Sequence, residues 1–172
     1  MFLIAKITKK KFPYVISAMK EPLVIAATTF SSILAMPSAI KVLTEKFDLD
    51  KDSVNLLIPV GITSFRYGAI FFFSFISVFV AQVYHVALAF SDYLIILIGA
   101  VMAGIAASSS GVVNLKFISI VLIPLGLPSS FVFAIFSLVD WFIDSTRTST
   151  NLLINMAITA FRSQKTKRNS NA

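Results

Sequence analysis

The chain is poor in the residues on which many protein chemistries depend. It contains no cysteine, which excludes disulfides, iron–sulfur clusters, thiolate zinc sites and cysteine nucleophiles. Its one histidine, His85, leaves almost no material for a multi-histidine metal site or a Ser-His-Asp triad. Only 13% of the residues are charged, about half the share found in soluble domains. Because the sequence offers neither a nucleophile–base pair nor a metal cluster, it argues against an enzyme.

The chain is rich in apolar residues. Of its 172 residues 57% are hydrophobic, the mean hydropathy is +0.87, and seventeen Phe stand against six Gly. A chain of this length could build one domain, but its polar residues are too few to coat a water-facing globule. The composition therefore predicts an integral membrane protein, with membrane lipid as its surroundings.

The net charge of +7 could indicate a nucleic-acid partner, but the positions of the charges argue otherwise. Twelve of the fifteen Lys and Arg fall in three clusters, at the N-terminal end, around 41–51 and after 161. Such clustering is typical of the positive-inside rule. Nucleic-acid binding would instead need a basic face on a soluble fold. We therefore expect no nucleic-acid partner, and a multi-pass protein of the cell (inner or plasma) membrane with both termini cytoplasmic.

The apolar segments are short for spanning helices. A span needs about 20 apolar residues, whereas several segments here are interrupted by Ser, Gly or Pro well before that length. The pattern predicts an all-α membrane protein with two re-entrant helical hairpins, one broken transmembrane helix and one long C-terminal helix. Ordinary core helices with loose caps are the alternative. The expected parts are a basic cytoplasmic segment 1–12, hairpin 13–44, broken span 54–83, hairpin 93–126, last helix 129–161 and a disordered basic cytoplasmic tail 162–172.

The last predicted helix carries a stripe of polar side chains. Spacings of three and four place them on one helix face. The stripe consists of Asp140, Asp144, Arg147, Thr148, Asn151 and Asn155. A charged group at the bilayer centre costs at least ~2.5 kcal/mol, so such groups persist when they face the protein interior or serve a function there.

Asp144 and Arg147 can serve a ligand in two complementary ways. Arg147 presents a planar fork that suits a carboxylate, and Asp144 can accept an ammonium group. Together they would clamp a zwitterion. The alternative is an internal ion pair, formed at spacing i,i+3, that only stabilises packing.

Serine-rich tips and one further arginine complete the set of candidates. Ser31 and Ser32 at one tip, and Ser108–Gly111 at the other, offer hydroxyls and backbone N–H groups that favour anions. Arg66 lies in the break of the span 54–83, and a buried arginine stays charged and needs an anion. Asp140, Asp144, a substrate carboxylate or water in a cavity would meet that need. Snorkelling to a membrane interface is the alternative.

These residues resemble a known family. The run Asp140–Asn151 resembles the last transmembrane helix of the dicarboxylate/amino acid:cation symporters, the glutamate/aspartate transporters, which reads D-x-x-x-D-x-x-R-T-x-x-N. Leu57–Gly61, Ala81-Gln82, Thr29–Ser32 with Met36-Pro37, and Gly126–Pro128 are similar to other elements of that family, in the same order. The resemblance runs from about Phe12 to Asn155, over a transport-domain-like membrane region 13–161.

The resemblance implies an elevator-type transporter and a role for each matching residue. Arg147 would bind the side-chain carboxylate of the substrate, Asp144 its amino group and Asn151 its main-chain carboxylate, while Thr148 lines the site. Ser31 and Ser32 would contact the substrate from the inner gate. The outer gate would be formed by 108–114, with Ser110 and Gly111 at its tip.

The chain also departs from the family. The family's N-M-D-G-T signature falls on 65–69, where only Gly68 is kept. The Asp that closes the family's last-helix motif falls on Asn155. The side chains of two sodium sites are thus missing or weakened. The resemblance places a weakened sodium site at Asn151, Asn155 and Gly61, while a third site, built largely from backbone carbonyls, could survive. Arg66 could replace the charge of a cation with a fixed one. The coupling ion, sodium or a proton, stays open, and no organic cofactor is expected.

The resemblance covers the C-terminal part of the family pattern. It implies a secondary active symporter of acidic amino acids or dicarboxylates, truncated to its substrate-binding part. A small anionic substrate and an N-terminal-half chain or a homologous trimer are the implied partners. A split transporter, a truncated remnant or an incomplete record would each account for the length. A non-transporting or regulatory membrane protein is the competing hypothesis.

Overall fold

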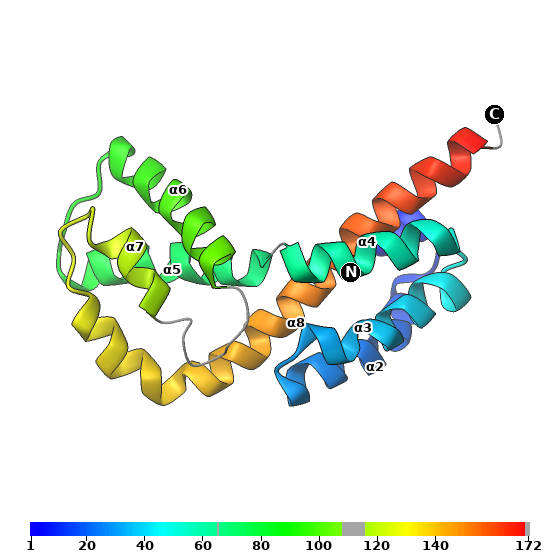
Figure 1. The fold of residues 1–172 in the computed structure, drawn as a ribbon, viewed down its shortest axis with the longest axis horizontal. Coiled ribbons are helices and arrows are strands. Elements are labelled where there is room, and N and C mark those ends of the chain that lie inside the picture. The colour runs from blue at the N-terminus through cyan, green and yellow to red at the C-terminus, as the bar shows by residue number, and fades with distance from the viewer. Residues whose placement is uncertain (65, 108–115, 171–172) are drawn as a thin grey trace. The chain divides into compact units, whose positions relative to one another are not determined.

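The fold is helical throughout the part of the chain that can be described. In the computed structural model, residues 1–64, 66–107 and 116–170 are described, and within these ranges no residue lies in a β-strand (Figure 1). This confirms the all-α prediction. The helices, in chain order, are α1 (Phe2–Thr8), α2 (Phe12–Thr29), α3 (Ser32–Lys41), the π-helix η1 (Val42–Lys46), α4 (Lys51–Ser64), α5 (Tyr67–Val83), α6 (Phe90–Ala106), α7 (Ser119–Leu122) and α8 (Ser129–Ser170).

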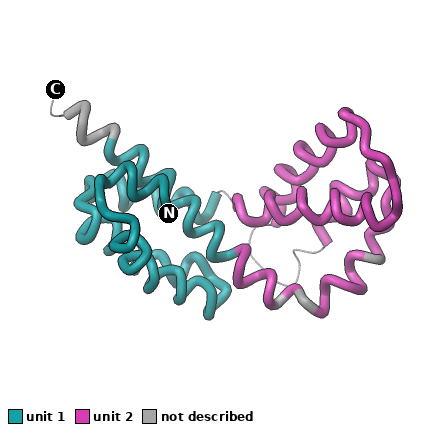
Figure 2. Tube along the Cα trace, turned by 180° about the vertical axis from the view of Figure 1, so that it is seen from behind, with its two compact units in different colours: residues 1–64, 148–172 teal, residues 65–147 magenta. Residues whose placement is uncertain are grey.

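The chain divides into two compact units, which Figure 2 distinguishes by colour. Unit 1 comprises Met1–Ser64 and Thr148–Ala172, and unit 2 comprises Phe65–Arg147. Helix α8 contributes its first half to unit 2 and its second half to unit 1. Each unit has its own cluster of buried apolar side chains.

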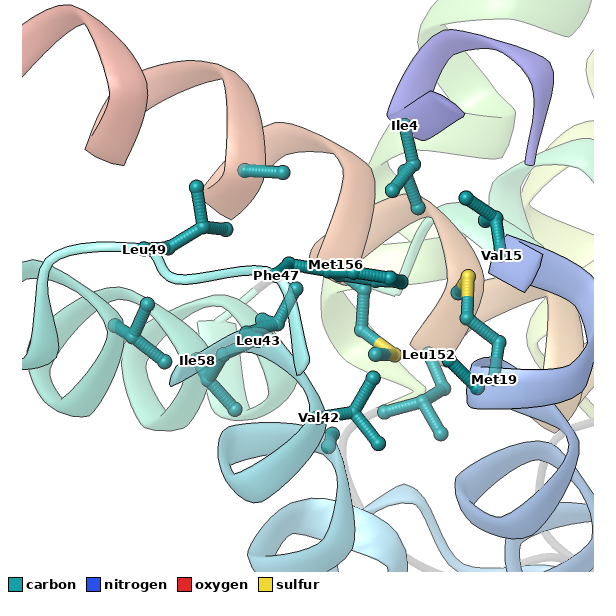
Figure 3. Packing of buried hydrophobic residues seen from close by; sticks show 14 of the residues in the cluster. Ile4, Val15, Met19, Val42, Leu43, Phe47, Leu49, Ile58, Leu152 and Met156 are labelled. Carbon is teal, nitrogen blue, oxygen red and sulfur yellow. The ribbon is translucent and has the colours of Figure 1, made fainter. Parts of the chain in front are cut away.

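The core of unit 1 surrounds the second half of α8. Leu152 and Met156 lie one turn apart on α8 and are fully buried among side chains of α2, η1 and α4 (Figure 3). Small residues such as Ala35 and Ala39 of α3 are also fully buried. Close packing through small side chains is typical of helices that associate in membranes.

Helices α2 and α3 pack together and are joined by a tight reversal. Phe30 ends α2 in the left-handed conformation, with φ of 53°. Ser31 is extended and caps α3, its Oγ accepting a hydrogen bond from the Leu34 N–H at 3.3 Å. The chain therefore turns at the serines that we expected at the tip of hairpin 13–44.

Helices α5, α6 and α7 form most of unit 2. Gly99 of α6 packs against Val121 of α7, and Gly104 packs against Ile70 of α5 so closely that a methyl group would not fit. Helix α4 ends at Ser64 and α5 begins at Tyr67, where we expected the broken span to be interrupted. By length and composition alone, the stretch Lys51–Val83 that holds α4 and α5 is apolar enough to cross a membrane.

Helix α6 begins earlier than the sequence suggested. We expected the second hairpin to begin at residue 93, but α6 starts at Phe90. The reason is local, because the Asp92 carboxylate accepts a hydrogen bond from the Ala89 N–H at 2.8 Å and so caps the first turn. The expected tip at Ser108–Asn114, which includes Ser110 and Gly111, lies outside the described residues.

The C-terminal end also differs from expectation. We expected a disordered tail from Arg162, whereas α8 continues through Ser170. Ser163 is fully buried, and the Gln164 Nε2 donates to the Ile7 carbonyl at 2.5 Å. Since a helix already formed extends at little cost, the burial of Ser163 and the contact of Gln164 with α1 favour helix beyond the predicted end.

Candidate functional site

The first part of the polar stripe of α8 lies in unit 2, where two carboxylates hold Arg147. Its Nε and Nη2 both donate to Asp144 Oδ1, at 3.1 Å and 2.5 Å. Nη2 also reaches Asp140 Oδ1 at 3.5 Å. Asp144 and Arg147 thus form the i,i+3 ion pair that we considered as the alternative to a clamp for a zwitterion. Asp140, two turns before Arg147 on the same stripe, is a second anionic partner.

Arg147 is buried, and one nitrogen of its guanidinium group makes no hydrogen bond to the described residues. The residue is only 7% exposed. Its Nη1 is buried and finds no hydrogen-bond partner within the part of the chain that the structure describes. A buried donor without a partner costs about 1–3 kcal/mol. The side chain is therefore anchored along one edge, while Nη1 on the other edge is buried and unpaired among the described residues.

Helix α5 covers the same arginine from another side. The Phe72 ring faces the guanidinium, with its centroid 4.7 Å from Arg147 Cζ, a favourable cation–π arrangement. Gly68, one turn earlier, lies directly against the Arg147 carbonyl oxygen. Nothing in the local sequence pattern relates the phenylalanine run 71–73 to Arg147.

Arg66 stands at the start of α5, in the N-cap position. It is half-buried, and its charge is near enough to interact electrostatically with Asp144 and Arg147. Among the options that we considered for Arg66, a charge interaction with Asp144 agrees with this position.

The stripe continues in unit 1 with two buried asparagines. The Asn155 Nδ2 donates to the Asn151 carbonyl at 2.9 Å, and its Oδ1 lies directly against Gly61 of α4. Asn151 is nine-tenths buried, and its Oδ1 has no hydrogen-bond partner among the described residues. Thr159 and Ser163 extend this buried row by two further turns. They follow Asn155 at successive spacings of four residues, and this pattern could have revealed them.

Asn155 thus links Gly61 and Asn151, the three residues at which we placed a weakened sodium site. Hard cations bind through several oxygen ligands. Here the Asn151 carbonyl already accepts from an amide, and one buried side-chain oxygen, Asn151 Oδ1, stands without a partner in the described part of the chain. Within the same ranges, no three His, Cys, Asp or Glu side chains gather as metal ligands would. These residues do not fit a cage of several oxygen ligands.

One serine of the first predicted hairpin, Ser32, contacts α8 within unit 1. The Ser32 Oγ donates to the Thr148 carbonyl at 3.4 Å, a long hydrogen bond. Ser31 uses its hydroxyl to cap α3, and Thr148 itself is half-buried. Unit 1 thus brings Ser32 to Thr148, while Ser31 has a local structural role.

Comparison with known proteins agrees with the resemblance drawn from the motifs. The model of the sodium:dicarboxylate symporter family matches residues 1–164. Human excitatory amino acid transporter 1 is 34% identical over 145 residues, which cover 84% of this chain and 27% of that protein. An excitatory amino acid transporter of Caenorhabditis elegans is 32% identical over 152 residues, or 88% of this chain and 30% of that protein.

A further relative leads to the same conclusion. Human excitatory amino acid transporter 5 is 33% identical over 147 residues, 86% of this chain and 26% of that protein. The chain spans between a quarter and a third of the length of these curated relatives. Their names are those of transporters, and the chain is not an enzyme. The polar stripe of α8 and a match over nearly all of its length make this chain a member of the sodium:dicarboxylate symporter family.

Proposed function

We propose that this chain supplies the substrate-binding part of a secondary active transporter, a symporter of acidic amino acids or dicarboxylates in the cell membrane. The observation that carries the proposal is the state of Arg147. It is buried, charged and fixed along one edge by Asp144, while Nη1 lacks a partner among the residues described. An arginine in this state suits a carboxylate ligand.

The ligand would engage the existing ion pair rather than a free charge. A substrate carboxylate binds Nη1 and competes with Asp144 for Nη2, since both accept from the same fork. An ammonium group on the same substrate compensates Asp144 as its bond to Arg147 weakens. An acidic amino acid carries both groups, so it replaces one ion pair by two. Phe72 restrains the guanidinium during this exchange.

The remaining expected contacts belong to the same proposal. Asn151 binds the main-chain carboxylate through its amide, Thr148 lines the site, and Ser31 and Ser32 contact the substrate from the inner gate. Ser110 and Gly111 contribute from the outer gate. Each role is tested by a single substitution to alanine at the serines, Thr148 and Asn151, with substrate affinity as the readout.

Surface composition supports the membrane location. On α6, large apolar side chains at helical spacing are 47–64% exposed, namely Leu94, Leu97, Ile98, Met102 and Ile105. Phe71 and Phe75 on α5 are 70% and 62% exposed. A row of this kind would be costly in water and is favourable against lipid. We place both termini on the cytoplasmic side, treat 13–44 and 93–126 as re-entrant, and expect an N-terminal-half chain or a homologous trimer as partner.

Binding of L-aspartate to the purified full chain in detergent, measured by calorimetry, tests the proposal. We expect saturable binding that Arg147→Ala abolishes, while Arg162→Ala, at an exposed arginine of the same helix, leaves it unchanged. Unchanged affinity in Arg147→Ala would refute the proposal. Uptake of labelled aspartate into proteoliposomes then separates a transporter from a membrane protein that binds substrate without moving it.

A further inference from the structure

The charged groups around Arg147 balance only when Arg66 is counted. Asp140 and Asp144 contribute two negative charges, and Arg147 contributes one positive charge. These three groups alone have a net charge of −1. The half-buried Arg66 guanidinium, whose charge interacts with both Asp144 and Arg147, brings the sum to zero.

The backbone around Arg66 keeps this charge in place. Its carbonyl accepts hydrogen bonds from the Ala69 and Ile70 N–H groups, at 3.0 Å and 3.1 Å, and so opens α5. Gly68 then packs on the Arg147 backbone and Phe72 on its guanidinium. The first turn of α5 is thus held against α8 at the cluster, with Arg66 at its leading end.

Charge balance matters because the cluster is largely withdrawn from water. The side chains of Asp140, Asp144 and Arg147 are only 16%, 17% and 6% exposed. Uncompensated charge in such surroundings is costly, and the cost is greater in a membrane. A cluster of net charge −1 would draw a cation from solution, whereas a neutral cluster has no such need.

We propose that Arg66 is a built-in cation for the Asp140–Asp144 carboxylate pair, so that this cluster is complete without a bound sodium ion. It follows that the carboxylate substrate binds here without sodium. The identity of this ligand rests on the proposed function. Arg66 is a positioning residue in this scheme, because it acts on the ligand through Asp144.

Thermal unfolding of the full chain in detergent tests the charge balance without any substrate. We compare sodium chloride with choline chloride at equal concentration, for the parent protein, Arg66→Gln and the control Arg162→Gln. We expect the parent and the control to have the same Tm in both salts. Arg66→Gln should have a lower Tm in choline and regain part of it in sodium. A sodium-specific rise in the parent's Tm, or an Arg66→Gln variant as stable as the parent in choline, would overturn the inference.

Aspartate titration of the same proteins separates this inference from the proposed function. We expect the parent to bind equally well in both salts, Arg66→Gln to bind about tenfold more weakly in choline, and Arg66→Lys to recover most of the loss. Binding by the parent only in sodium would refute the built-in cation and leave the proposed function intact. Absence of binding in both salts would refute the proposed function, while the unfolding experiment still decides the role of Arg66.

Discussion

The ring of Phe72 lies over the guanidinium of Arg147, 4.7 Å from ring centroid to Cζ, and so joins the first turns of α5 to the polar stripe of α8. With Asp144 bonded along one edge, the fork is restrained by a ring on its face and a carboxylate on its side. A substrate would therefore meet an arginine whose orientation is already set, which lowers the entropic cost of binding.

Replacing Phe72 by leucine should weaken this restraint. The buried ring contributes a cation–π interaction of roughly 1–2 kcal/mol, so we expect unfolding of the full chain in detergent to require about that much less free energy. Phe71→Leu is the matched control, because Phe71 is 70% exposed and adjacent in sequence. Equal losses in the two variants would contradict the assigned contact.

Asp144 and Asp140 should differ in their contribution to stability. Asp144 Oδ1 accepts two hydrogen bonds from Arg147, whereas Asp140 accepts one at the long distance of 3.5 Å. Removing the main partner of a buried charge costs about 3–5 kcal/mol, so Asp144→Asn should be severely destabilised. Asp140→Asn should lose roughly 1 kcal/mol, the contribution of an ordinary hydrogen bond. Chemical denaturation of both variants measures the difference, and the reverse order would show that Asp140 is the principal partner.

Two glycines should respond differently to a single added methyl group. At Gly68 the methyl would meet the backbone carbonyl of Arg147, and at Gly61 it would meet the side-chain amide of Asn155. A side chain can rotate away, whereas the backbone of a helix cannot. We therefore expect Gly68→Ala to lose more than the 1–3 kcal/mol typical of overpacking and Gly61→Ala to lose less. Thermal unfolding in detergent provides the comparison, in which a larger loss at Gly61 would be contrary to expectation.

The character of the Asn155 site can be tested with a change of one atom. Asn155 is 3% exposed, and its amide nitrogen donates to the Asn151 carbonyl. Asn155→Asp replaces that donor with a buried carboxylate oxygen facing a carbonyl oxygen, so we expect a loss of several kcal/mol. Asn155→Leu removes the hydrogen bond without adding charge and should lose roughly 1 kcal/mol. If denaturation shows that the Asn155→Asp variant is more stable than Asn155→Leu, a bound cation or a proton must neutralise the new carboxylate.

Local periodicity accounts for what could be predicted from the sequence. The helical class, the stripe on α8 and the pairing of Asp144 with Arg147 all depend on residues within two turns of each other, whose relative positions a helix sets by itself. Family resemblance extended the prediction to Gly61 and Asn155, which do lie together. The helical end of α8 was not predicted, because the contacts of Ser163 and Gln164 with the rest of unit 1 outweigh a polar local composition.

The immediate surroundings of Arg147, in contrast, were decided only by tertiary structure. Phe72 and Gly68 belong to a helix far away in sequence, and nothing in an apolar run shows which side chain will face a charge. Close packing of α5 on α8 selects them, because a glycine lets the two backbones approach and the ring then falls over the guanidinium. The same approach brings Arg66 near Asp144, and so turns an unbalanced row of charges on one helix into a neutral cluster shared by two.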